Sequence, residues 1–107
     1  MLSSGQVRGF RDLIVWQKAM RLRRQVHLIV TALPREARFE IGAQIQRAAL
    51  SIPCNIAEGH ARPSRRDYRQ YLSISLGSAA ELETQLLALG EDYAFLAEQI
   101  DAALSLR

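Results

Sequence analysis

A proline stands inside a segment whose apolar spacing is otherwise that of a helix. The segment reads SIPCNIAEG over residues 51–59, with Pro53 as its third residue. A proline in a helix interior costs about 3 kcal/mol, because it removes one backbone donor and crowds the carbonyl four residues earlier. Surrounding packing must hold such a helix in place, so the segment predicts an all-helical bundle in which one helix bends at Pro53.

The chain has room for one modest hydrophobic core, since it has 107 residues of which 49% are apolar. We expect a single domain over residues 1–107, with residues 1–9 as a flexible arm. No apolar run approaches the roughly 20 residues that span a bilayer, and the N-terminus lacks a signal peptide's apolar block. The expected location is the cytoplasm, away from membranes. Cys54 is the only cysteine, and we interpret it as a buried inert thiol rather than a nucleophile.

The first predicted helix lies between Asp12 and Pro34 and carries two apolar stripes. The main stripe recurs in alternating steps of four and three residues, at Val15, Ala19, Leu22, Val26, Ile29 and Leu33. A second stripe lies about 100° around the same cylinder, at Trp16, Met20, His27 and Val30. A helix of a monomeric four-helix bundle needs one stripe, so the second predicts an oligomer interface at Trp16, Met20 and His27.

Three further helices complete a predicted antiparallel, up-and-down four-helix bundle. The second covers residues 36–57, with Gly59 as its C-terminal stop. The third begins at a Ser64–Asp67 capping box and continues to Gly90, with small central side chains that let a neighbouring helix approach closely. The fourth, over residues 93–105, is too short to cover the others. A partner, or the N-terminal arm through Phe10, is expected to cover the rest of the core.

Several polar residues are interpreted as structural. Asn55 either bonds the carbonyl of Ala49 or Ser51 near Pro53, or a partner on another helix. Arg47 either faces solvent or pairs with Glu81 or Glu83, because a carboxylate close to the seam needs an arginine. The predicted structural residues are Pro53, Asn55, Glu58, Gly59, Glu81 and Glu83.

Positive charge gathers in the first part of the chain. Residues 1–69 carry 13 basic and 5 acidic side chains, whereas residues 70–107 carry 1 and 6. Up-and-down topology brings the start of the first helix and the turn between the second and third to one end. That end collects Arg8, Arg11, Arg62, Arg65, Arg66 and Arg69. Repeated around a cyclic oligomer, these arginines predict a phosphate-binding rim. The alternative is that they pair with Glu58, Asp67 and acids of neighbouring subunits.

The usual sequence features of an enzyme are absent: a phosphate-cradling glycine loop, a nucleophile elbow, and a histidine paired with a plausible nucleophile. Di-metal sites in bundles use glutamate with histidine three residues on, and neither His27 nor His60 has that spacing. We therefore expect no catalytic residues, no metal and no cofactor.

Three sequence blocks stand out: FRDLIVWQKAM at residues 10–20, SIPCNIAEG at 51–59 and GSAAELETQL at 77–86. Together they resemble the bacterial four-helix-bundle proteins called 23S ribosomal RNA intervening-sequence proteins. The resemblance implies a ring-like homopentamer, often encoded within ribosomal RNA genes. A similar protein, the accessory variability determinant of diversity-generating retroelements, binds nucleic acid and a reverse transcriptase. Neither resemblance implies an enzyme. The chain differs from the family pattern after Gly90, since the family's last helix usually continues further than Arg107.

The predicted function is therefore a non-catalytic homo-oligomer that binds RNA or DNA through its arginine-rich end, with a protein partner such as a reverse transcriptase as a further expectation. The alternative is a structural or adaptor oligomer that mediates protein–protein interactions and binds no nucleic acid.

Overall fold

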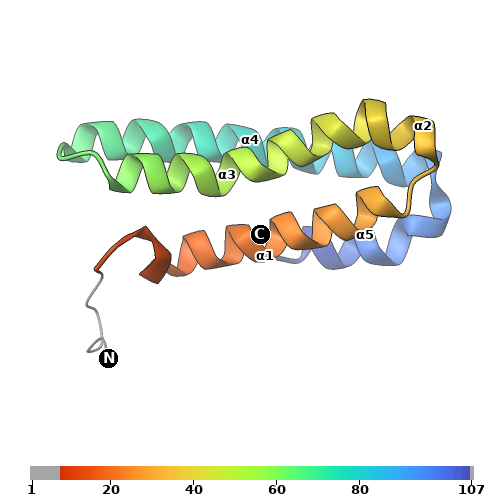
Figure 1. Cartoon of the computed structure of the whole chain (residues 1–107), viewed down its shortest axis with the longest axis horizontal. Helices are drawn as coiled ribbons and strands as arrows, with labels where there is room; N and C mark the ends of the chain where they lie inside the picture. The colour runs from red at the N-terminus through yellow and green to blue at the C-terminus, as the bar shows by residue number, and fades with distance from the viewer. Residues whose placement is uncertain (1–7, 107) are drawn as a thin grey trace.

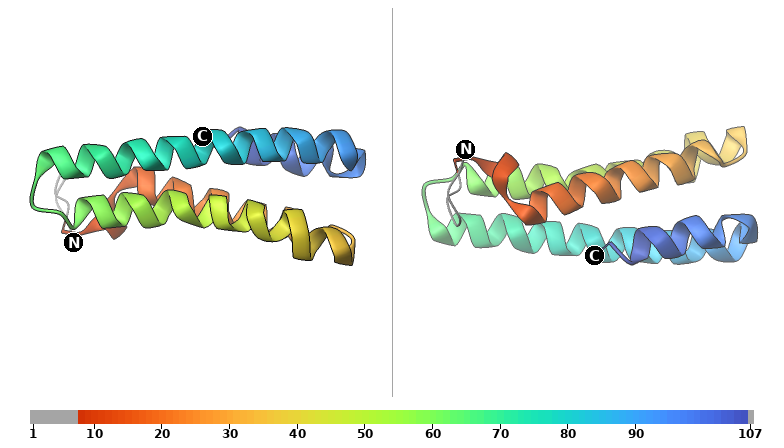
Figure 2. Two further views of the ribbon diagram at one scale, coloured as in Figure 1. Left: turned by 90° about the horizontal axis from the view of Figure 1, so that it is seen from above. Right: turned by 90° about the horizontal axis from the view of Figure 1, so that it is seen from below.

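The computed structural model describes residues 8–106, which form a compact all-α bundle of four helices (Figure 1). These helices are α1 (Ile14–Thr31), α3 (Ala43–His60), α4 (Arg65–Asp92) and α5 (Ala97–Leu104). Short segments connect them: η1 (Phe10–Asp12), α2 (Arg35–Ala37), η2 (Arg38–Gly42) and η3 (Ala94–Leu96). Figures 1 and 2 place α3 beside α4, α1 below α3, and α5 below α4. The predicted all-α bundle of four helices is thereby confirmed; its assembly into a ring stays a prediction.

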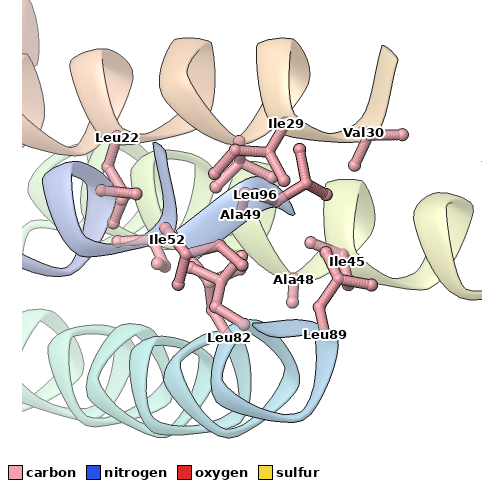
Figure 3. Packing of buried hydrophobic residues seen from close by; sticks show 14 of the residues in the cluster. Leu22, Ile29, Val30, Ile45, Ala48, Ala49, Ile52, Leu82, Leu89 and Leu96 are labelled. Carbon is pink, nitrogen blue, oxygen red and sulfur yellow. The ribbon is translucent and has the colours of Figure 1, made fainter. Parts of the chain in front are cut away.

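The core lies between the four helices and is built from the predicted seams. Figure 3 shows Leu22 and Ile29 of α1 pointing toward Ile45 and Ile52 of α3, with Leu82 of α4 closing the other side. Burial of such side chains stabilises the fold by about 1.5–3 kcal/mol each. The apolar spacing of α1, α3 and α4 thus placed the core correctly.

Helix α3 continues through Pro53 without a break. Asn55 Nδ2 donates to the Ser51 carbonyl at 2.8 Å, which confirms one of the two roles expected of this amide. From α4, the buried Ser75 hydroxyl donates to the Ile52 carbonyl at 3.0 Å. The two bonds thus satisfy the carbonyls of the two residues just before the proline. The bend at Pro53 stays a prediction.

The small residues at the centre of α4 do allow α3 to approach. The hydroxyls of Ser51 and Ser78 lie 2.8 Å apart, and Ser75 is buried against α3. Larger side chains at these positions would hold the two helices apart. The expectation that a helix packs against this stretch is confirmed.

Several details differ from the sequence prediction. Helix α3 continues past Gly59 to His60, so Gly59 is not its stop. Helix α4 likewise continues past Gly90 to Asp92. Residues Arg38–Gly42 form a π-helical turn that the sequence did not indicate. Cys54 is exposed rather than buried, because it lies on the side of α3 away from the seam.

Helix α5 covers only part of the bundle. It has 8 residues where α4 has 28, and it packs on α1 and α4 at the end where α4 finishes. The prediction that the last helix leaves part of the core uncovered is correct. Within residues 8–106, no helix is both long enough and apolar enough to cross a membrane.

Candidate nucleic-acid interface

The structure brings most of the predicted arginines to the end of the bundle where α3 meets α4, at the left of Figure 1. We call the six the arginine-rich end: Arg8, Arg11, Arg62, Arg65, Arg66 and Arg69, all of them exposed. Four lie in the α3–α4 turn and the first turns of α4. The other two lie in or just before η1, which packs against α1 and α3.

Arg62 is the arginine that the structure holds most firmly. Its Nη2 donates to the Tyr71 hydroxyl at 2.8 Å and lies 3.4 Å from Glu58 Oε2. Its guanidinium also lies over the Tyr71 ring, 5.1 Å from the ring centre. Because the Arg62 and Glu58 side chains are 43% and 54% exposed, this ion pair adds little stability. Its effect is to fix the direction of Arg62.

Gly59 makes the Tyr71 contact with Arg62 possible. A Cβ atom at Gly59 would lie 2.6 Å from Tyr71 Cβ and 3.0 Å from Tyr68 Cδ1. Without that atom, α4 can approach α3 and bring Tyr71 under the α3–α4 turn. Tyr68 packs edge-on against His60, with ring centres 5.8 Å apart. These aromatic contacts pack the first turns of α4 against the end of α3 and so stabilise the α3–α4 turn. Sequence periodicity gave no signal for the role of Tyr71, since it depends on how the turn closes.

The remaining arginines of α4 form a different group. Arg65, Arg66 and Arg69 lie within an arc of about 100° on the first turns of the helix. Among the described residues, no carboxylate forms an ion pair with any of the three. Ser64 caps this helix end, accepting a hydrogen bond from the Asp67 amide at 3.2 Å. The capping interaction is thereby confirmed. The positive end of the helix dipole adds to the arginine charges and favours anions there.

Arg8 and Arg11 belong to the start of the chain. The Arg8 amide donates to Asp12 Oδ2 at 3.0 Å, and Gln17 Nε2 donates to the Arg11 carbonyl at 2.9 Å. These bonds fix the backbone and leave both guanidinium groups exposed. Over the described residues, the expected pairing with acids occurs at Arg62 and Glu58. Asp12 instead accepts from a backbone amide.

The predicted oligomer residues of α1 are each partly buried within the subunit. Trp16 packs edge-on against Phe10, with ring centres 5.3 Å apart. His27 Nδ1 lies 3.3 Å from Gln46 Oε1 of α3. Met20 lies between them on the same side of α1 and is half-buried. The second stripe is thus used in part inside the subunit, and its role as an interface stays a prediction.

The other predicted structural residues lie along α3 and α4. Arg47 is exposed and shares a shallow hollow with Glu81, Ser51 and Ser78. Glu83 is half-buried beside Leu22 and Ala103, in the region where α5 meets α1. Arg47 therefore follows the solvent-facing alternative.

Comparison with known protein families gives one finding that covers nearly the whole fold. A family model described as "23S rRNA-intervening sequence protein" matches residues 11–106. No curated protein matches the chain. The matched range begins at Arg11 and takes in α1, α3, α4 and α5.

Proposed function

The chain belongs to the 23S rRNA-intervening sequence protein family, and from that premise we propose that it is a non-catalytic, homo-oligomeric bundle of the cytoplasm that binds RNA or other nucleic acid through its arginine-rich end. The supporting observation is the group of Arg65, Arg66 and Arg69, exposed and without acidic partners among the described residues. Arginine suits phosphate because its planar group offers two parallel donors.

Two features favour phosphate binding over a merely solvated surface. The three arginines lie in the first turns of α4, where the free backbone amides and the helix dipole also attract anions. Arg62, turned by Tyr71, stands beside them in the same turn. The flexible phosphate backbone of RNA can contact several of these arginines at once, and each arginine–phosphate contact releases counterions.

Association of subunits would extend this surface. A ring of identical subunits repeats each arginine-rich end around one rim, and the resemblance supports a homopentamer. A protein partner such as a reverse transcriptase is a further proposal from the same resemblance. The competing function is an adaptor oligomer without nucleic acid. In its favour, Ile14, Leu76 and Phe39 are among the large apolar side chains left exposed, at 69%, 72% and 72%.

Binding of a structured RNA across a salt series tests the proposal. The triple variant Arg65→Gln, Arg66→Gln and Arg69→Gln should bind more weakly, and the slope of log affinity against log salt should shrink by about 2, since each phosphate contact contributes about 0.7–0.9. Arg62→Gln should have a smaller effect, because Tyr71 and Glu58 already engage its side chain.

The control changes two arginines, Arg35 and Arg38, to glutamine at the opposite end of the bundle, where Glu36 and Glu40 lie nearby in the sequence. This variant should keep the parent's affinity and salt slope. No binding by the parent at low salt, or equal losses in the triple variant and the control, would favour the adaptor function instead.

A further inference from the structure

A second pair of arginines lies on the side of the bundle, where α1 packs against α3. Arg23 of α1 and Arg47 of α3 line one hollow of about 160 Å³, together with Gln46 and Leu50 of α3. Arg23 is half-buried and Arg47 is exposed. The hollow lies about 20 Å along α3 from the helix end at His60. It is therefore separate from the arginine-rich end.

Neither guanidinium group of this hollow is neutralised within the described part of the subunit. Among residues 8–106, no carboxylate forms an ion pair with Arg23 or Arg47, and no acceptor takes a hydrogen bond from either side chain. Glu81 of α4 lines an adjoining hollow that Arg47 also lines, but the two do not come within ion-pair distance. One carboxylate offsets one positive charge at most. The hollow thus keeps a net positive charge, and a half-buried guanidinium without an acceptor favours an anion from outside.

The third polar side chain of the hollow also offers a donor. Gln46 Oε1 lies 3.3 Å from His27 Nδ1. An amide oxygen can only accept, so the His27 ring donates in this bond. The Gln46 Nε2 amide, with its two hydrogens, is left for a ligand. Three side chains at the hollow therefore offer donors, which is the chemistry that binds an oxyanion.

The helix that carries Arg23 favours a polyanion over a single carboxylate. Helix α1 has four basic residues and no acidic one, the basic residues being Lys18, Arg21, Arg23 and Arg24. Their combined field attracts a nucleic-acid chain, with its many phosphates, more strongly than one carboxylate. Leu50 is 48% exposed beside the two arginines of the hollow. Its apolar surface suits the sugar or base attached to a phosphate, so nucleotide phosphate is the ligand that fits best.

We propose that this hollow binds a phosphate group of an RNA chain through the Arg23 and Arg47 guanidinium groups, with the Gln46 amide as a third donor. The inference deepens the nucleic-acid function proposed above and rests on it, because the same chain would contact both the arginine-rich end and the side of the bundle. The rival occupant is a neighbouring subunit, since Arg23 lies on the same stripe of α1 as Trp16 and Met20. A neighbour that covered Arg23 would have to bring a carboxylate.

Protection of arginines from chemical modification tests the inference on the unaltered protein. Phenylglyoxal reacts with accessible guanidinium groups, and mass spectrometry of the peptides reports each arginine separately. An RNA of about 12 nucleotides should slow the reaction of Arg23 and Arg47 by at least about fivefold at saturation. Arg21 is the internal control, because it lies about 200° around α1 from Arg23 and does not line the hollow. Its rate should change less.

A free nucleotide distinguishes the two sources of phosphate. Adenosine monophosphate at the same concentration should protect Arg23 and Arg47 less than the RNA does, because the RNA is also held at the arginine-rich end. Equal protection by the free nucleotide would overturn the assignment to an RNA chain.

A double variant and a matched control locate the contact. Arg23→Gln with Arg47→Gln should weaken RNA binding by at least about tenfold and reduce the slope of log affinity against log salt by about 0.8, because one phosphate contact is lost. Arg21→Gln with Arg24→Gln removes the same charge from α1 outside the hollow. This control should weaken binding by less than about threefold. Equal losses in the two variants would overturn the inference.

The outcomes separate this inference from the proposed function. If the RNA protects the arginine-rich end but not Arg23 and Arg47, the nucleic-acid function stands and the hollow has no part in it. If the RNA protects neither group, both proposals fail. Sedimentation of the RNA-free protein tests the rival occupant. A lower mass for Arg23→Gln with Arg47→Gln than for the parent would overturn the inference, since a carboxylate of a second copy would then fill the hollow.

Discussion

Gly59 is buried where α3 packs on the first turns of α4, and its missing side chain decides how closely the two helices approach. The nearest atom to a Cβ built there is Tyr71 Cβ, at 2.6 Å. That atom is fixed to the α4 backbone and cannot rotate away as the end of a long side chain can. Tyr71 in turn orients Arg62. One glycine therefore sets both the packing of the turn and the direction of an arginine.

Gly59→Ala should destabilise the fold by about 1–3 kcal/mol, because the clash with Tyr71 outweighs the gain in helix propensity. Gly77→Ala is the control: Gly77 lies in α4 with nothing within 4 Å of its Cβ position. It should stabilise the fold by about 0.5–1 kcal/mol. Urea unfolding measures both. Equal stability of Gly59→Ala and the parent would mean that α3 and α4 have room to spare at this point.

At the scale of helices, apolar periodicity predicted where each helix lies, and the local bonds at Ser64 and Asn55 followed from their positions. The helix ends were harder to predict. Gly59 was predicted to end α3, but its role in the structure is to let α4 pack closely against α3. The π-helical turn had no signal in the apolar spacing. Its last residue, Gly42, packs closely on α1, since a Cβ there would lie 2.8 Å from Val30 Cγ1. The Arg62–Tyr71 contact likewise depends on how the α3–α4 turn closes. Such features arise from contacts between helices.

The start of α4 carries both a structural cap and the three arginines proposed to bind phosphate. Ser64→Ala removes the bond from the Asp67 amide and should destabilise the fold by about 1 kcal/mol. Exchange of the Asp67 amide should accelerate, because it loses its acceptor. Ser73→Ala, at an exposed site in the same helix, should change stability by less than about 0.5 kcal/mol. Thermal unfolding and hydrogen exchange measure both variants, and identical behaviour would show that the cap contributes nothing.

At the scale of the whole molecule, the charges are separated along the bundle. The arginine-rich end lies where α4 begins, whereas the acidic residues of the chain's last third lie along the rest of α4 and in α5. Large apolar side chains also remain exposed on α1 and α4. Association would stabilise such a subunit, because neighbouring subunits would bury these exposed apolar side chains. Aligned subunits would place their positive ends on one side, so the nucleic-acid proposal is strongest for the assembled protein.

The second apolar stripe of α1 tests that assembly. Trp16 is partly covered by Phe10 in its own subunit, and a neighbour would cover the remainder of its surface. Trp16→Asp should therefore lower the mass in solution, measured by sedimentation, because a carboxylate is costly to bury at a contact. Met20→Asp repeats the test with a smaller loss of internal packing, should Trp16→Asp unfold the bundle. Phe95→Asp, where the side chain is 64% exposed near α5, should leave the mass unchanged. A monomeric parent at micromolar concentration, or a lower mass from Phe95→Asp alone, would place the interface elsewhere or remove it.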